Sequence, residues 1–328
     1  MKTGVVFTLC LTTKLDNKFN NKIMKILITG GAGYKGTILV KKLLELGHNV
    51  TILDNFMYGF EPILHLISNP LLSVIKNDIR NLNETILKDF DVIYHLAGIS
   101  GYPACEANPH SAQLINVEAT KLLKELASAQ QIIIYASTTS FYGQSGNKCD
   151  ETTPVQPVSL YGVTKYQAEQ ILMERENTIS LRFATIFGVS PRMRSDLLVN
   201  DFTYRSITDR CIVLCESGST RTFLHIEDAI DAYALSLKKF QIMKGEIFNV
   251  GHESLNFTKL EIAEKIASQT GCKIIRSEMN DPDVRSFEVS FEKIRKLGFI
   301  PKRTLDEGVA EMVKLYNFYK PYLAYKTI

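Results

Sequence analysis

The chain has 328 residues, of which 45% are hydrophobic and 22% charged, as is usual for a globular protein. This composition excludes a disordered, collagen-like or coiled-coil chain, and the net charge of +3 is too small to indicate binding to nucleic acid or to a membrane surface. The sequence contains no run of 18 apolar residues, so we expect no transmembrane helix.

Residues 1–23 form an N-terminal extension that we expect to be dispensable. The apolar stretch 4–11 follows Lys2 and is weakly similar to a signal peptide. Met24, however, could serve as a second translation start. A cofactor-binding pattern typical of cytosolic proteins begins at Lys25, so we interpret the stretch as a non-conforming leader or an upstream start. We therefore expect a cytoplasmic protein.

The six cysteines contain no CxxC pair. A chain of this length can bury a core without disulfides, which favours reduced, mostly structural thiols. Cys211 and Cys215 have no second ligand pair at finger-like spacing, so no metal site is expected.

From Lys25 onward, short apolar segments alternate with longer helical patterns. We expect strands at 25–29, 50–53, 72–75, 92–96, 132–136 and 179–183, and helices at 37–46, 111–127 and 161–175. Alternation of this kind predicts βαβ units, and nearly all-apolar strands predict a parallel sheet covered by helices on both faces. The expected fold class is therefore α/β, with a Rossmann-type doubly wound parallel sheet.

Beyond about residue 190 the alternation is less regular. Helices are expected at 196–203, 228–237, 257–269 and 305–316, with short strands at 212–214 and 274–275. We therefore divide the chain into the extension 1–23, a Rossmann domain over 24–190 and a smaller C-terminal α/β region over 191–328.

A glycine-rich turn connects the first strand to the first helix. Gly30, Gly33 and Gly36 are spaced G-x-x-G-x-x-G: the first permits the tight turn, the second lets a diphosphate approach, and the third lets the helix pack closely on the sheet. Asp54 follows Gly36 by about 18 residues, the spacing of an acid that binds the ribose 2′-hydroxyl and repels a 2′-phosphate, which favours NAD over NADP. The alternative is that Asp54 only caps a turn. Asp78 follows the third strand and could meet the adenine.

Tyr161 and Lys165 lie four residues apart on a predicted helix and therefore share a face. A phenol has a pKa of about 10 in water, and a neighbouring ammonium favours the phenolate that can act as a base. Thr138, at the end of the fifth strand, is placed to hydrogen bond the same substrate oxygen. The pattern YxxxK is also a frequent chance match, so an ordinary surface pair is the alternative.

With these motifs the chain resembles the extended short-chain dehydrogenase/reductase family, in its nucleotide-sugar epimerase and dehydratase branch. The resemblance covers nearly everything from Lys25 onward. It rests on ordered matches at 29–36, 54–55, 78–80, 95–98, 108–109, 116–117, 137–138, 142–143, Tyr161, Lys165, 181–183, 187–188, 221–225, Asp228 and 297–299.

The resemblance implies NAD as cofactor, a nucleotide-diphosphate sugar as substrate, and binding of the sugar nucleotide mainly by the region 191–328. Thr138, Tyr161 and Lys165 match the family's catalytic residues. The implied cofactor-binding residues are Gly30, Gly33, Tyr34, Lys35, Gly36, Asp54, Asn55, Asp78, Ile79, Leu96, Ala97, Gly98, Tyr161 and Lys165. The implied substrate-binding residues are Thr138, Thr185, Arg192, Asn200, Arg221 and Arg285, with Arg194 as a further candidate; a solvated side chain is the alternative for Arg285.

The chain departs from the family pattern at three positions. The 4,6-dehydratases carry Asp-Glu where this chain has Thr139 and Ser140, and the family's decarboxylases keep a glutamate at the position of Ser140, so both activities are disfavoured. Thr185 replaces the family's usual asparagine, which points to an unusual sugar or base.

We therefore expect an NAD-dependent nucleotide-sugar 4-epimerase that acts through a transient 4-keto intermediate. The alternatives are a 4,6-dehydratase or 4-ketoreductase of the same family, or a non-catalytic NAD-binding regulator or RNA-binding relative. The resemblance also implies a homodimer, in which the helices at 111–127 and 161–175 pair with their symmetry mates.

Overall fold

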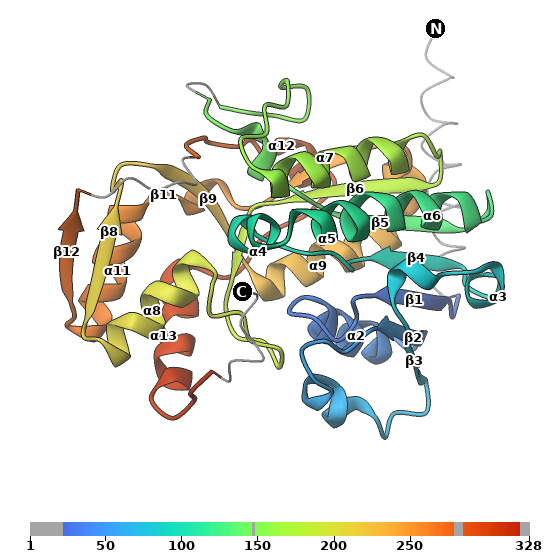
Figure 1. The fold of residues 1–328 in the computed structure, drawn as a ribbon, viewed down its shortest axis with the longest axis horizontal. Coiled ribbons are helices and arrows are strands. Elements are labelled where there is room, and N and C mark those ends of the chain that lie inside the picture. Colours follow the sequence, from blue (N-terminus) through green and yellow to red (C-terminus); the bar gives the residue numbers. More distant parts are fainter. Residues whose placement is uncertain (1–21, 146–147, 279–284, 322–328) are drawn as a thin grey trace, which may run out of the picture.

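The computed structural model describes residues 22–145, 148–278 and 285–321. Its centre is a parallel sheet of seven strands in the order β10-β6-β5-β4-β1-β2-β3 (Figure 1). The strands are β1 (Lys25–Thr29), β2 (Asn49–Asp54), β3 (Leu72–Lys76), β4 (Val92–His95), β5 (Ile132–Thr138), β6 (Thr178–Phe183) and β10 (Ile247–Val250). The predicted doubly wound α/β fold is confirmed.

The strand order reverses between β1 and β4. From β1 the chain adds β2 and β3 on one side, and then returns to add β4, β5 and β6 on the other. In open α/β sheets, ligands bind beyond the carboxyl ends of the strands at such a reversal. The glycine-rich turn follows β1 and therefore lies at this point.

The apolar strands alternate their side chains between two cores, as expected for a sheet covered on both faces. Ile26, Ile28 and Ile52 face one core, which α2 (Gly36–Glu45) and α9 (Ile226–Lys238) cover. Leu27 and Ile133 face the other, which α6 (Ala119–Leu126) and α7 (Leu160–Met173) cover. This division fits the predominance of apolar residues in the strands, although β6 also carries Thr178, Ser180 and Arg182.

The helix predicted at 111–127 has an irregular centre. Helix α5 (Pro109–Gln113) leads into a π-helical turn, η3 (Leu114–Glu118), before α6 begins. Asn116 lies in this turn, and its side chain hydrogen bonds to both backbone groups of Ile99 and to Thr164. A π-helical turn often marks a functional site, and here it aims an amide at the loop after β4.

The C-terminal region adds two small sheets, one of β7 (Thr185–Phe187), β9 (Thr220–His225) and β11 (Asn256–Thr258), the other of β8 (Cys211–Cys215) and β12 (Lys273–Ser277). Its longer helices are α8 (Leu198–Thr208), α11 (Lys259–Thr270) and α13 (Leu305–Tyr316). The shorter ones are α3 (Glu84–Leu87), α4 (Tyr102–Ala107), α10 (Phe240–Met243), α12 (Glu292–Lys296), η1 (Glu61–Leu66), η2 (Ile79–Asn81), η4 (Ser140–Tyr142) and η5 (Glu253–Leu255).

Two expectations for this half need correction, and a third stays untested. The main sheet does not end with the strand at 179–183, because β10 pairs in parallel with β6. The helix expected at 257–269 begins at Lys259, since Phe257 belongs to β11 and Thr258 forms a capping box with Glu261. The division of the chain near residue 190 stays a prediction. Two elements from beyond that point belong to the Rossmann domain in space: β10 adds a strand to its sheet, and α9 packs on one face of the sheet.

Most of the extension 1–23 lies outside the described residues, as does Cys10. Among the described residues the other five cysteines form no disulfide, and Cys105 and Cys149 are buried. Among the described helices, none combines the length and apolarity that crossing a bilayer requires.

Candidate active site

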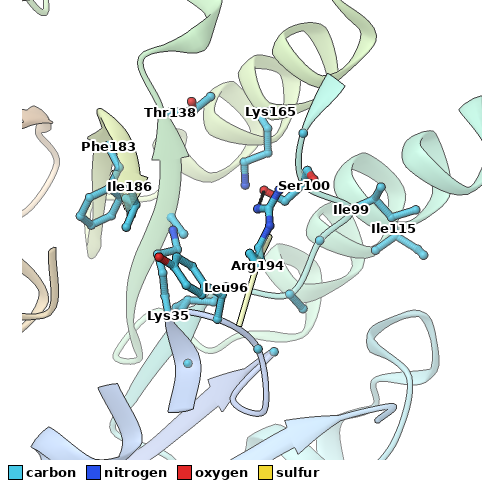
Figure 2. Close-up of a pocket in the computed structure, with 18 of the residues that line it drawn as sticks. Lys35, Leu96, Ile99, Ser100, Ile115, Thr138, Lys165, Phe183, Ile186 and Arg194 are labelled. Atoms are coloured by element: carbon cyan, nitrogen blue, oxygen red, sulfur yellow. Dashed lines mark hydrogen bonds between the residues drawn. The ribbon is translucent and has the colours of Figure 1, made fainter. Parts of the chain in front are cut away.

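A large pocket opens beyond the carboxyl ends of β1, β2, β4, β5 and β6 (Figure 2). All the sequence-predicted cofactor residues and the three predicted catalytic residues line it, and so do Thr185, Arg192 and Arg285. Asn200 and Arg221 do not. The structure thus brings together side chains from residue 30 to residue 285 in one cavity.

The glycine turn is compact because three of its residues lack a side chain. Gly30 has φ +72°, and a Cβ there would lie 2.7 Å from the Ala97 nitrogen. A Cβ on Gly36 would lie 2.3 Å from the Gly30 carbonyl oxygen, so this glycine permits close packing against the turn itself rather than against the sheet as expected. No side chain caps the N-terminus of α2. The Thr37 N–H bonds to the Gly33 carbonyl oxygen, and the N–H groups that precede it in the turn can meet an anion such as a diphosphate.

Asp54 fixes the shape of the pocket at the end of β2. Its carboxylate accepts hydrogen bonds from the backbone nitrogens of Ala32 (3.0 Å) and Phe56 (2.9 Å), which ties the glycine turn to the next loop. Burial raises the pKa of Asp54 above its ordinary value. An ionised carboxylate has acceptor capacity beyond these two bonds, so Asp54 caps a turn and can still accept from a ribose hydroxyl.

Asp78 is held by its neighbours at the end of β3. Arg80 Nε donates to its carboxylate at 2.8 Å and Asn55 Nδ2 at 3.2 Å. The hydrogen bonds from Arg80 lower the pKa of Asp78 well below its ordinary range. A fixed carboxylate beside Asn55 suits recognition of the adenosine end of a dinucleotide.

Arg192 offers unused hydrogen-bond donors to this same end of the pocket. Its guanidinium lies 3.9 Å from the centroid of the Tyr58 ring, and its charge acts on the nearby Asp54 carboxylate. Arg192 is buried, yet within the described residues its Nε and one Nη have no hydrogen-bond partner. Buried donors need acceptors, so this geometry fits a bound ligand. Arg192 was expected to bind the sugar nucleotide; its place beside Asp54 favours the cofactor, and the substrate role stays a prediction.

The predicted catalytic residues come from β5 and α7. Thr138 Oγ1 donates to Ser140 Oγ (2.9 Å) and accepts from the Ser140 backbone nitrogen (3.0 Å), which fixes the hydroxyl at the strand end. Lys165 is buried, with Nζ 4.1 Å from the Tyr135 ring centroid, and burial lowers its pKa to about 7. Tyr161 is half-buried on the same helix and lines the pocket.

A buried ion pair holds α7 against the sheet. Arg182 Nη2 lies 2.7 Å from Glu169 Oε1, and both side chains are at most 3% exposed. Ser180 Oγ donates to Glu169 (2.6 Å), and Arg182 Nη1 donates to the Tyr142 hydroxyl (2.8 Å). Glu169 lies one turn beyond Lys165, so the pair fixes the face that carries Tyr161 and Lys165. Sequence reasoning assigned no role to Glu169, although an acid on that face and an arginine in an apolar strand were visible signals.

Arg194 is a second site residue that the motifs placed only loosely. It forms an ion pair with Asp196, and its Nη1 donates to Ser100 Oγ at 3.2 Å. Figure 2 shows Arg194 beside Lys165 and Ser100, with its side chain in the pocket. Arg194 therefore adds a fixed cation near the catalytic helix.

Asn200 and Arg221 lie behind the pocket wall. Asn200 is fully buried on α8, where its side chain accepts from the Gly188 nitrogen and donates to the Arg194 carbonyl oxygen and the Tyr34 hydroxyl. It supports the wall rather than facing the cavity, because those three partners use its polar atoms. Arg221 is buried on β9 outside the lining residues. Neither residue lines the pocket, so their contact with substrate stays a prediction.

The pocket is strongly basic. Within the described residues, its cationic lining consists of Lys35, Lys165, Arg192, Arg194 and Arg285, and its acidic lining consists of Asp54 and Asp78. Asp78 is already paired with Arg80. Such an excess of positive charge suits ligands that carry several phosphates.

Comparison with known proteins agrees with this geometry. Residues 26–251 match the model of a family described as the NAD dependent epimerase/dehydratase family. UDP-glucuronic acid decarboxylase 1 of Arabidopsis thaliana is 30% identical over 322 residues, covering 92% of this chain and 72% of that protein. An uncharacterized UDP-glucose epimerase of Bacillus subtilis is 30% identical over 247 residues, covering 70% and 77%.

A solved structure extends the likeness to the whole fold. The crystal structure of UDP-glucuronic acid 4-epimerase from Bacillus cereus, in complex with UDP-glucuronic acid and NAD, superposes with a TM-score of 0.79. The two chains are 25% identical, and the superposition covers 90% of this chain and 99% of the other.

Proposed function

Because the chain belongs to the NAD-dependent epimerase/dehydratase family, we propose that it is a nucleotide-sugar 4-epimerase. NAD is its cofactor. The glycine turn, the uncapped start of α2 and the donors of Arg192 suit the diphosphate and adenosine parts of NAD, and Asp54 suits its ribose. When bound, NAD supplies the acceptor and donor of hydride.

The residues at the other end of the pocket manage the proton and the oxygen. Tyr161 takes the proton of the C4 hydroxyl as that carbon is oxidised, and returns it when the ketone is reduced from the opposite face. Thr138 Oγ1 accepts from the Ser140 backbone nitrogen, and its hydroxyl turns from Ser140 Oγ to donate a hydrogen bond to the same sugar oxygen. The Lys165 ammonium stabilises the phenolate form of Tyr161. Arg194 and Arg285 are placed to hold the diphosphate of the sugar nucleotide.

The observation that carries this proposal is that, among the described residues that line the pocket, no carboxylate lies beside Thr138 and Tyr161. Among the described residues that line the pocket, the acids are Asp54 and Asp78, both on the cofactor side. Thr139 is buried with its hydroxyl bonded to the Phe183 carbonyl oxygen, and Ser140 carries only a hydroxyl. Dehydration needs an acid and a base at these positions, whereas epimerisation needs only Thr138, Tyr161 and Lys165.

We propose a UDP-sugar as substrate, with UDP-glucuronic acid tested first. Several similar proteins act on or bind this compound by name. The hydroxyls of Thr138, Ser140 and Thr185 line the pocket and can donate to a sugar carboxylate. Ser140 and Thr185 stand where other branches of the family carry an acid or an amide.

Product analysis tests the proposal directly. The protein is incubated with NAD and either UDP-glucuronic acid or UDP-glucose, and the products are separated and weighed by mass spectrometry. Epimerisation gives a new compound of unchanged mass. Loss of water would indicate a dehydratase, loss of carbon dioxide a decarboxylase, and NADH-dependent gain of two hydrogens a ketoreductase; each of these results would overturn the proposal.

We further propose a cytoplasmic homodimer. The segment from α5 to α6 packs beside α7 on one face of the sheet (Figure 1), and these helices are the ones expected to pair with their symmetry mates. Light scattering of the purified protein gives the test: a mass of twice the chain supports the dimer, and a mass of one chain contradicts it.

A further inference from the structure

Lys35 places an ammonium group inside the pocket without an acid to pair with it. Its side chain leaves the glycine turn, and Nζ lies 4.6 Å from the centroid of the Phe183 ring and 5.7 Å from that of Tyr233. In the part of the chain that the structure describes, no hydrogen bond or ion pair involves this Nζ. Aromatic faces attract a cation, but they replace only part of its lost hydration.

The nearest charges repel the Lys35 ammonium. Burial lowers the pKa of Lys35 to about 7, and the charges of Lys165 on α7 and Arg194 on the loop before α8 add to this shift. Figure 2 shows the three side chains around one cavity. Repulsion among these side chains lowers the stability of the ligand-free protein. A bound ligand changes the charge around Lys35, so we expect the Lys35 ammonium to affect ligand affinity.

The Lys35 ammonium lies where we expect the nicotinamide ring of the cofactor to bind. It belongs to the turn that suits the diphosphate, yet its Nζ lies beside Phe183, the residue paired in register with catalytic Thr138. The nicotinamide ring has to lie between the diphosphate and the carbon that Thr138 and Tyr161 address. The Lys35 side chain extends over the same distance, from the glycine turn to Phe183.

We propose that Lys35 sets the balance between the oxidised and reduced forms of bound NAD. The ring of NAD⁺ carries a positive charge, which disappears when the C–H bond of the sugar carbinol breaks and its hydride is transferred, while the hydroxyl proton passes to Tyr161. The Lys35 ammonium opposes the charged ring and leaves the neutral ring unaffected. It therefore favours the reduced cofactor and the ketone over the oxidised cofactor and the alcohol.

The test compares the affinities of the two cofactor forms in the absence of sugar. Dissociation constants for NAD⁺ and NADH are measured by titration calorimetry at pH 6 for the wild type and for Lys35→Met and Lys35→Gln. We expect both substitutions to tighten NAD⁺ relative to NADH by about tenfold, since one unit charge near the ring is removed. For a two-electron couple, tenfold corresponds to about 30 mV in the reduction potential of the bound cofactor.

A surface lysine on the adjoining helix gives the matched control. Lys41 lies on α2 with a 59% exposed side chain, so Lys41→Met should leave the affinity ratio unchanged. The proposal is overturned if Lys35→Met and Lys35→Gln change both affinities equally, change neither, or differ from one another, because packing rather than charge would then be responsible. The measurement requires NAD binding but no turnover, so failure of the proposed epimerisation would leave its outcome unaffected.

Discussion

The two ends of the pocket are built in different ways. The cofactor end is set by backbone: Gly30 bonds to the Leu53 carbonyl oxygen, and Asp54 accepts from two main-chain nitrogens. The substrate end is set by side chains from distant segments, among them Thr138, Thr185 and Arg285. Backbone geometry requires particular residues at fixed spacing, whereas a side-chain surface can be altered one residue at a time. This contrast explains why the cofactor is common to the family while its reactions differ.

The largest effect on NAD binding is expected from adding a Cβ to the glycine turn. Gly36→Ala would place a methyl group 2.3 Å from the Gly30 carbonyl oxygen, so the turn must open. We expect loss of measurable NAD binding and a free energy of unfolding lower by about 1–3 kcal/mol. Calorimetric titration and chemical denaturation measure the two effects.

Gly218→Ala is the matched control for this substitution, since a Cβ there would meet nothing within 4 Å. Unimpaired NAD binding by Gly36→Ala would show that the turn does not hold the diphosphate.

Removing one partner of the Glu169–Arg182 pair tests how the catalytic helix is held. Arg182→Met leaves the Glu169 carboxylate buried and unpaired, and should lower the free energy of unfolding by about 3–5 kcal/mol. The double variant with Glu169→Leu removes that charge as well and should recover part of the loss. If the free energy of unfolding lost by the double variant exceeds the sum of the losses in the two single variants, breaking the ion pair is not the cause of the loss in Arg182→Met.

Two arginine substitutions separate the ends of the pocket. Arg192→Met removes buried donors beside Asp54 and should weaken NAD binding by about tenfold or more, with little change in the KM for the sugar nucleotide. Arg285→Met should raise the KM for the sugar nucleotide and leave NAD binding nearly unchanged. Equal effects of both substitutions on both ligands would contradict the assignment of Arg192 to the cofactor end.

The last predicted effect is on the pH dependence of stability. Burial lowers the pKa of Lys35 and of Lys165 to about 7, below that of a free lysine, so the unfolded chain binds more protons than the native one above pH 7. Stability of the ligand-free protein should therefore rise from pH 7 to pH 9, with each lysine contributing about 1 kcal/mol per pH unit. Denaturant titrations of the wild type and Lys35→Met should converge toward pH 9. A constant difference between them would indicate that Lys35 does not titrate in this range.

The sequence was most informative where local physics dominates. The glycine turn, Asp54 and the strands up to residue 183 follow from spacing and apolar patterns, and they lie where expected. The strand β10 was missed because it has only four residues and pairs with β6, a strand far back in the chain, although Gly245 and Gly251 flank it. Asn200 was assigned to the substrate by resemblance, yet its amide bonds to Gly188 and Arg194, a long-range arrangement that no local pattern reveals.

The central claim is that a carbinol hydrogen leaves the sugar and returns to the same carbon. A UDP-sugar labelled with deuterium at C4 tests this most directly, with the product examined by mass spectrometry and NMR and with Tyr161→Phe run in parallel. The account predicts a C4 epimer that retains the deuterium in the wild type, and NAD binding without product in the variant. Release of the label to solvent, a product of altered mass, or wild-type turnover by Tyr161→Phe would contradict it.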